Sequence, residues 1–295
     1  MSKTTVIIGL GVIARYHVLA LRQAKQFCLK AVCDLRAEAA QDSLYYDLPY
    51  FRDYEELIDT IRPEIAIIAT PPDTHYKIAA ACVQRGVLPI VEKPLATMEE
   101  EGMHFFSEPL QGRYVPLCHT LYGEETLWFN KHLPLQDIRS IHMSLSDPYA
   151  DENGHIEERY LSLGGSWLDS APNALAVLLP IAPSLTDIEV THLRDEHSGL
   201  PFASALKARY EQAAVRIEID WHKGINHKQT DILADGKEIC INHSQQTVTI
   251  NGEQVFKAQG DRLTQQYANF YRLYPENLPS ETKMRTMYQI IYSHL

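Results

Sequence analysis

The sequence has few cysteines, and their spacing limits what they can do. The 295 residues include five of them, none in a C-x-x-C pair: Cys28, Cys33, Cys82, Cys118 and Cys240. An odd number at these intervals excludes a disulfide framework and a zinc site built on paired thiolates. We therefore expect reduced thiols in a cytoplasmic protein.

Long apolar runs are also missing. No stretch approaches the roughly 18 residues of a membrane-spanning helix, and the run Ala174–Leu179 stops at Pro180. The N-terminal run Val6–Ile8 is broken by Gly9 and Gly11, and no small-x-small cleavage site follows it. The sequence therefore predicts neither a membrane anchor nor a secretion signal.

Positive charge is in deficit. The 27 Lys and Arg residues stand against 38 Asp and Glu residues, which leaves a net charge of −11. A surface of that sign repels phosphate backbones and anionic lipids, so nucleic acid and membranes are not expected as partners. The hydrophobic and charged fractions, 45% and 22%, are those of ordinary globular proteins. The length fits roughly two domains.

Histidines do not cluster along the chain. Five of them stand singly, namely His142, His155, His192, His222 and His227. Metal-binding histidines usually come as a close pair with a carboxylate, so these positions predict no metal site.

The first third of the chain alternates short apolar runs with helical stretches. Strands are expected at Thr4–Gly9, Leu29–Asp34, Ile65–Ala69 and Val87–Val91, and helices at Ile13–Ala24, Asp53–Ile61 and Thr74–Arg85. Continuous Ile and Val runs between helices predict a parallel sheet covered on both faces, which is the doubly wound Rossmann arrangement. We place this α/β dinucleotide-binding domain at residues 1–117.

From about Cys118 the pattern becomes that of antiparallel strands. Turn signals and strand-type residues predict a meander of strands at Ile138–Ser146, Ile188–Leu193, Ala205–Tyr210, Ala213–Trp221, Gln229–Ala234, Glu238–Asn242 and Thr247–Ile250. Closing helices are expected at Asp261–Tyr274 and Glu281–Leu295. Residues 118–295 should form an α+β substrate domain with an open, mainly antiparallel sheet, whose last helix can pack back on the first domain. Because an open sheet has a face to cover, we expect a homodimer or homotetramer.

A glycine fingerprint joins the first expected strand to the first helix. The run Gly9-Leu10-Gly11-Val12-Ile13-Ala14 has the G-x-G-x-x-G/A form, which permits a tight turn, close approach of a pyrophosphate and close helix packing. The helix N-terminus then offers free N–H groups to the phosphates. Asp34 ends the second strand, where its carboxylate can accept hydrogen bonds from the adenosine ribose.

The same strand end bears on the choice of cofactor. The charge of Asp34 repels a 2′-phosphate and so favours NAD. Arg36, two residues further on, could instead pair with that phosphate. We therefore predict NAD and leave NADP open.

Three further segments, together with the fingerprint, resemble one family of oxidoreductases. They are Ala69-Thr70-Pro71-Pro72-Asp73-Thr74-His75, Glu92-Lys93-Pro94-Leu95-Ala96, and Gly164-Gly165-Ser166-Trp167-Leu168-Asp169 followed by Asn173. Over nearly its whole length the chain is similar to the glucose–fructose oxidoreductase/inositol dehydrogenase (Gfo/Idh/MocA) family. The resemblance implies hydride transfer between a nicotinamide and a sugar or polyol. It assigns to the cofactor crevice Thr70, Pro71, Pro72, His75 and Glu92.

Lys93 corresponds to the family's lysine beside the nicotinamide, which binds the reacting hydroxyl. Physical reasoning agrees without the resemblance, because a lysine at the carboxyl end of a parallel strand lies where such sheets bind ligands. A desolvated ammonium there can exchange a proton with an alkoxide-like oxygen. The alternative is a surface lysine in a turn.

The second-domain segment departs from the commonest family pattern. Asp169 matches the family's aspartate, but Asn173 stands where a histidine base is usual, and an amide cannot titrate. The run Asp169–Leu175 instead resembles the aldose 1-dehydrogenases that act on L-arabinose and D-galactose, and His119 matches a histidine of their substrate cleft. An anomeric hydroxyl is more acidic than an ordinary alcohol, so Lys93 or Asp169 could serve as its base.

We therefore expect oxidation of an aldose at C1 to its lactone. Lys93 would take the proton, Asp169 would tune Lys93 and hold a ring hydroxyl, and Asn173 would orient the sugar. His119 and Trp167 are further candidate substrate contacts, although Trp167 could equally belong to the core. Two alternatives stay open: a dehydrogenase for a secondary hydroxyl of inositol or another polyol, and a dinucleotide-dependent sensor without turnover.

Overall fold

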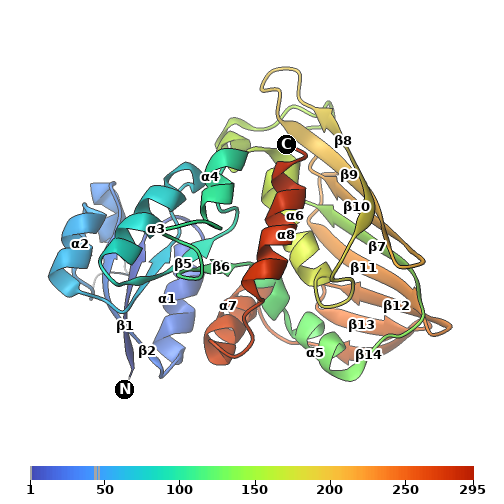
Figure 1. Ribbon diagram of the computed structural model, residues 1–295, viewed down its shortest axis with the longest axis horizontal. Coiled ribbons are helices and arrows are strands. Elements are labelled where there is room, and N and C mark those ends of the chain that lie inside the picture. The colour runs from blue at the N-terminus through green and yellow to red at the C-terminus, as the bar shows by residue number, and fades with distance from the viewer. Residues whose placement is uncertain (1, 43–44, 46) are drawn as a thin grey trace. The chain divides into compact units, whose positions relative to one another are not determined.

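The chain forms two compact units (Figure 1). This computed structural model describes residues 2–42, 45 and 47–295. Unit 1 consists of Met1–Cys118 and Tyr267–Gln289, and unit 2 of His119–Gln266 and Ile290–Leu295. The boundaries near the C-terminus fall inside helices α7 (Arg262–Leu273) and α8 (Glu281–Tyr292), so each of these helices contributes residues to both units.

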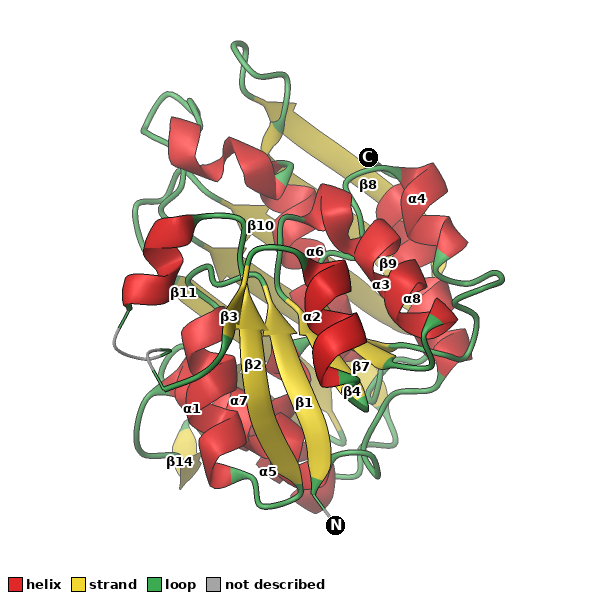
Figure 2. Cartoon of the chain, turned by 90° about the vertical axis from the view of Figure 1, so that its left-hand side faces the viewer, coloured by secondary structure: helices red, strands yellow, loops and turns green. Residues whose placement is uncertain are grey.

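Unit 1 is built on a parallel six-stranded sheet. In spatial order its strands are β3 (Tyr50–Phe51), β2 (Phe27–Cys33), β1 (Lys3–Ile8), β4 (Ile65–Ile68), β5 (Leu88–Glu92) and β6 (Val115–Leu117). The helices between them are α1 (Ala14–Gln23), α2 (Tyr54–Ile61), α3 (His75–Gln84) and α4 (Glu99–His104). Figure 2 shows α1 and α2 to either side of β1 and β2. The predicted doubly wound sheet is confirmed.

Local chemistry explains the elements that the sequence predicts best. All four residues of β4 are buried, because its Ile-rich run has helices on both faces. Helix α2 begins after Asp53, whose carboxylate accepts hydrogen bonds from the N–H groups of Glu55 and Glu56 at 2.8 and 3.0 Å. The helix ends at Arg62 in a left-handed conformation with φ of 50°.

Unit 2 contains an eight-stranded sheet. In spatial order the strands are β14 (Glu253–Lys257), β13 (Thr247–Ile250), β12 (Lys237–Asn242), β11 (His227–Ala234), β7 (Ile138–Ser146), β10 (Ala213–Asp220), β9 (Pro201–Tyr210) and β8 (Thr186–Arg194). Neighbours are antiparallel except β7 and β10, which run parallel. The mainly antiparallel sheet is confirmed, but the simple meander is wrong. Strand β7 lies between β11 and β10, a pairing across about seventy residues that no local turn signal reveals.

One face of the second sheet is covered from within the unit. The residues of β10 alternate between buried and more exposed, as expected of a strand with one covered face. Helix α6 (Gly165–Leu178) packs against β7, β9 and β10, and all of its residues are buried. Helix α5 (Glu124–His132) contacts β12, β13 and β14. Across the described residues, every helix is too short or too polar to span a bilayer.

Candidate active site

The glycine fingerprint forms the turn between β1 and α1. Gly9 has φ of 93°, and a Cβ there would lie 2.6 Å from backbone atoms of Ala69 and Thr70, so glycine is required. A Cβ on Gly11 would meet no atom within 4 Å, which leaves space over the turn for a ligand. Ala14 is fully buried and lets α1 pack closely. These features fit a dinucleotide.

The N-terminus of α1 is suited to an anion. Its N-cap residue, Ile13, has an apolar side chain that cannot accept a hydrogen bond, and the first turn holds no acidic residue. Val12 is exposed beside it. The partial positive charge of this helix end is therefore not neutralised by an acidic side chain of the first turn, which suits a pyrophosphate.

Asp34 directly follows β2, and its carboxylate is enclosed by donors. Oδ2 accepts the N–H of Leu10 at 2.8 Å and Nη2 of Arg36 at 2.9 Å. Oδ1 accepts the backbone N–H and Nε of Arg36 at 2.9 and 3.0 Å. Burial acts to raise the pKa of Asp34, but these hydrogen bonds outweigh it and lower that pKa.

The four bonds use the four lone-pair positions of the Asp34 carboxylate. A ribose diol would therefore have to displace the Arg36 side chain. That side chain is 56% exposed, and its Nη2 also donates to the carbonyl of Leu10 at 3.2 Å.

The loops after β4 and β5 hold the other residues assigned to the cofactor. These are Thr70, Pro71, Pro72, His75, Glu92 and Lys93. His75 is buried, and its ring nitrogens lie 2.8 Å from the carbonyl of Thr70 and 3.0 Å from that of Pro94. It therefore ties one loop to the other. Burial lowers the pKa of His75, so the ring is neutral near pH 7.

Lys93 directly follows β5, and its N–H belongs to a buried polar network around Glu92. The carboxylate of Glu92 accepts the hydroxyl of Tyr267 at 2.7 Å and the N–H of Lys93 at 3.2 Å, and it lies 3.0 Å from Nε2 of His17. The other nitrogen of His17 lies 2.6 Å from the hydroxyl of Tyr271. The network fixes the turn that carries Lys93. Sequence reasoning missed His17, Tyr267 and Tyr271, because these contacts join distant parts of the chain.

Helix α6 carries the candidate substrate residues of unit 2. Asp169 and Asn173 lie one turn apart on the same face, with only 7% and 5% of each residue exposed. Oδ1 of Asn173 is buried and has no hydrogen-bond partner among the described residues. An unpaired buried oxygen costs about 1–3 kcal/mol, which a donating ligand hydroxyl would recover.

A one-turn 3₁₀ helix, His119–Tyr122, packs against α6. The hydroxyl of Thr120 donates to the carbonyl of Asn173 at 3.0 Å. Nδ1 of His119 lies 2.8 Å from Oε1 of Gln266. With the amide in this orientation, Nδ1 donates to Oε1 of Gln266.

Trp167 has the surroundings of a core residue. It is 1% exposed, and its indole N–H donates to the carbonyl of Ile291 at 2.9 Å. Of its two interpretations, this burial favours core packing over stacking on a sugar.

A buried ion pair lies on the covered face of the second sheet. Nζ of Lys228 is 2.6 Å from Oδ1 of Asp147, and the side-chain amide of Asn226 donates to the same oxygen at 2.6 Å. Burial lowers the pKa of Lys228, while Asp147 and Asp169 act to raise it. Sequence reasoning missed this pair. The available signal was a lysine in the buried register of β11, where Thr230 follows it.

Comparisons with known proteins place this geometry in a wider context. Residues 3–107 match the family model GFO_IDH_MocA, described as an oxidoreductase family with an NAD-binding Rossmann fold. Inositol 2-dehydrogenase/D-chiro-inositol 3-dehydrogenase of Lactiplantibacillus plantarum is 29% identical over 112 residues, which are 36% of this chain and 32% of that protein. The scyllo-inositol 2-dehydrogenase (NADP(+)) IolW of Bacillus subtilis is 27% identical over 97 residues, or 32% and 27% of the two chains. The chain thus aligns with about a third of these relatives' length.

A solved structure extends the likeness to both units. A levoglucosan dehydrogenase in complex with NADH and levoglucosan has a TM-score of 0.81, covering 99% of this chain and 95% of that one at 16% identity. That identity shows a shared fold. The glycine turn, the enclosed Asp34 and the family match together indicate an NAD-binding Rossmann fold in residues 3–107. In this segment the chain is similar to the NAD-binding domain of the Gfo/Idh/MocA family, as its motifs predict.

Proposed function

We propose that the protein is an NAD(P)-dependent dehydrogenase that oxidises an aldose at C1. The observation that carries the proposal is the buried amide oxygen of Asn173, which has no partner among the described residues and lies one turn from Asp169. Such a pair can accept two sugar hydroxyls without itself titrating. When bound, the nicotinamide supplies the hydride acceptor.

In this proposal Lys93 holds the C1 hydroxyl and removes its proton. Glu92 acts through Lys93 as a positioning residue, since its carboxylate accepts the Lys93 N–H at the end of β5. Asn173 accepts a ring hydroxyl at Oδ1, and Asp169 accepts another.

Dehydrogenation of a secondary hydroxyl of a polyol is the second candidate. One observation favours it: the curated relatives, matched over about a third of their length, are named as inositol dehydrogenases. His119 would then do the work expected of the histidine that Asn173 replaces.

We further propose NAD as the preferred cofactor, with NADP admitted. The charge of Asp34 supports the first, and the Arg36 guanidinium beside it supports the second. A homodimer or homotetramer is proposed as the assembly. Apolar side chains on the second sheet support it, because Leu193, Leu233 and Val255 are exposed.

The test is nicotinamide absorbance at saturating NAD or NADP over a panel of aldoses and polyols. Turnover on aldoses with none on inositols supports C1 oxidation, and the reverse pattern supports the second candidate. No turnover on any compound of the panel, together with intact NAD binding, would favour the alternative of a sensor without turnover.

Lys93→Met is the decisive variant. It should reduce kcat by about 10²–10⁴-fold and leave the Kd for NAD within about twofold. Lys77→Met, at an exposed position of α3, is the matched control and should change neither value. Joint loss of turnover, NAD binding and stability in Lys93→Met would mean that Lys93 is structural.

A further inference from the structure

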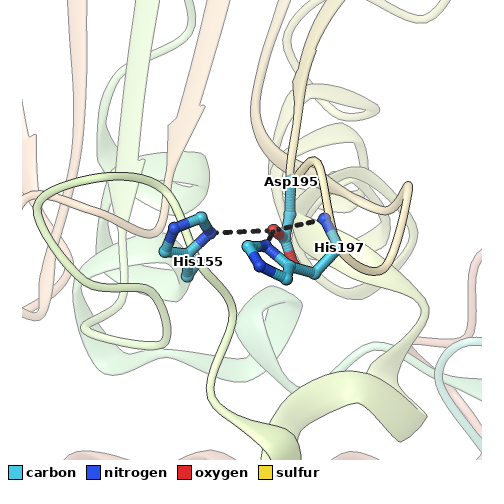
Figure 3. A group of neighbouring side chains, drawn as sticks. All are labelled: His155, Asp195 and His197. Carbon is cyan, nitrogen blue, oxygen red and sulfur yellow. Dashed lines mark hydrogen bonds and ion pairs between the residues drawn. The ribbon is translucent and has the colours of Figure 1, made fainter.

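Two histidines and an aspartate meet in unit 2, away from the residues discussed above (Figure 3). His155 comes from loop 151–157, and Asp195 and His197 come from the turn that follows β8. Nδ1 of His155 lies 3.2 Å from Oδ1 of Asp195, and Nδ1 of His197 lies 3.6 Å from the same oxygen. The three ligand atoms all lie within 4.8 Å of one another.

The carboxylate at the centre of this cluster is held from several sides. Oδ2 of Asp195 accepts the hydroxyl of Ser198 at 2.7 Å and the N–H of Ile156 at 3.4 Å. Oδ1 accepts the N–H of His197 at 3.1 Å. The position of Asp195 is therefore fixed before any ligand arrives, as a preorganised site requires.

The loop that carries His155 is fixed as well. Oδ1 of Asp151 accepts the N–H of His155 at 2.9 Å, and Gly154 has φ of 81°. A Cβ on Gly154 would lie 2.5 Å from the ring of Phe202, so only glycine lets the loop lie against that ring. Both imidazoles remain accessible, with side-chain exposures of 43% for His155 and 74% for His197.

Hydrogen bonds within this cluster cannot pair both imidazole Nδ1 atoms with Oδ1 of Asp195. Oδ1 of Asp195 has two lone pairs, and the N–H of His197 uses one of them. Both imidazole Nδ1 atoms face the remaining lone pair, and only one of them can donate to it. A cation would instead accept one lone pair from each ring and one from the carboxylate.

We propose that His155, Asp195 and His197 bind a zinc ion. Zinc–nitrogen and zinc–oxygen bonds of about 2.0–2.1 Å in a tetrahedron place neighbouring ligand atoms about 3.3 Å apart, close to the two separations found here. Zinc suits two imidazoles and one carboxylate, whereas magnesium and calcium prefer oxygen ligands alone. A water molecule completes the tetrahedron. The exposed side chain of His197 can rotate so that a nitrogen of each ring lies at bonding distance from the zinc ion.

Such an ion would be structural. It joins loop 151–157 to the turn between β8 and β9, over a small cluster in which Ala150 and Ile156 pack with Trp221. The 3₁₀ helix Glu158–Leu163 follows this loop and leads to Gly164, the N-cap of α6. Zinc would therefore hold the segment that precedes the helix with Asp169 and Asn173. The chain spacing concealed the site, since His155 and Asp195 are 40 residues apart.

The experiment is equilibrium dialysis of the full chain against zinc alone, after removal of bound metal with a chelator. We expect one zinc per chain, with an affinity at least tenfold lower in His155→Ala and in His197→Ala. His142→Ala is the matched control, because His142 pairs with Glu218 elsewhere in the unit. Cys240→Ser tests whether a partly exposed thiol holds the metal instead.

Cobalt gives a second measurement. Co²⁺ in place of zinc should show the intense visible bands of tetrahedral coordination in the wild-type chain and lose them in His197→Ala. Zinc at about a hundredfold excess over its Kd should also raise Tm by about 5 °C in the wild-type chain and in His142→Ala only. His197 is mostly exposed, so its variant should fold. Binding that is not stoichiometric, or that survives both histidine variants, would overturn the proposal.

Discussion

Units 1 and 2 assemble their functional residues in different ways. In unit 1 they follow the ends of successive parallel strands, so that Gly9, Asp34, Thr70 and Lys93 each come within two residues of a strand end. In unit 2 they lie on the buried helix α6 and in the 3₁₀ helix His119–Tyr122 that packs against it. The parallel sheet therefore places its functional residues in short sequence motifs after the strands. In unit 2 the polar residues are spread through the buried core.

The largest effect should come from the polar core of unit 2. Lys228→Met leaves Asp147 buried without its cation, and we expect a loss of about 3–5 kcal/mol in the free energy of unfolding. Denaturant titration measures it, with exposed Lys207→Met as the control. Adding Asp147→Asn should restore part of the loss. An unchanged midpoint in Lys228→Met would show that the pair contributes nothing to stability.

Next come the two glycines, which should separate folding from binding in unit 1. Gly9→Ala meets backbone at 2.6 Å in a left-handed conformation and should cost roughly 2 kcal/mol or more of stability. Gly11→Ala points into open space and should leave stability almost unchanged while weakening NAD binding about tenfold. Thermal unfolding and NAD titration of both variants check this. Equal behaviour of the two would contradict the assignment of the open space to the cofactor.

A smaller and purely functional effect is expected at Asn173. Asn173→Ala removes the unpaired Oδ1, so stability should stay within about 1 kcal/mol while KM for the sugar rises about 10-fold or more. Steady-state kinetics separates KM from kcat. An unaltered KM would remove Asn173 from the substrate site.

Arg36 should change cofactor preference and little else. Arg36→Ala removes the only side chain that donates to the Asp34 carboxylate among the described residues, so NAD should bind equally well or more tightly, and NADP about tenfold more weakly. Parallel Kd measurements for the two cofactors test this. If NADP affinity were retained, Arg36 would not contact the 2′-phosphate.

The smallest effect concerns the pH dependence of unit 1. Because burial lowers the pKa of His75, the unfolded chain takes up a proton first as pH falls below about 6.5, and the folded state loses stability down to the folded pKa. We expect His75 to contribute at most about 1.4 kcal/mol of loss per pH unit in that range. Unfolding free energies at pH 7 and pH 5 should differ less in His75→Gln than in the wild-type chain. An identical difference would contradict a neutral buried ring.

Prediction from sequence succeeded for elements whose bounds are determined by neighbouring residues. Strand β7 has the predicted bounds, and the cap at Asp53 marks the start of α2. It failed where the position of an element depends on residues far away in the sequence, as in the insertion of β7 between β11 and β10. Strands β3 and β14 also went unpredicted, because β3 is two residues long and β14 has an exposed, polar pattern.

The residues of the candidate site likewise include some that local motifs predict and others that depend on distant contacts. Lys93, Asp169 and Asn173 follow from motifs, and they remain predictions until they are tested. The partners of Glu92 could not be found in this way, since Tyr267 lies 175 residues further along the chain. Nothing in the local sequence marks a tyrosine that satisfies a buried carboxylate so far away.

The split of α7 between the two units has a consequence for synthesis on the ribosome. The sheet of unit 1 leaves the ribosome first, whereas Tyr267 and Tyr271, whose hydroxyls hydrogen-bond with Glu92 and His17, come much later in the chain. A growing chain can therefore complete the polar core of unit 1 only after Tyr267 and Tyr271 have left the ribosome. For the same reason, a fragment that ends at Cys118 would lack the hydroxyls of Tyr271 and Tyr267 that hydrogen-bond with His17 and Glu92.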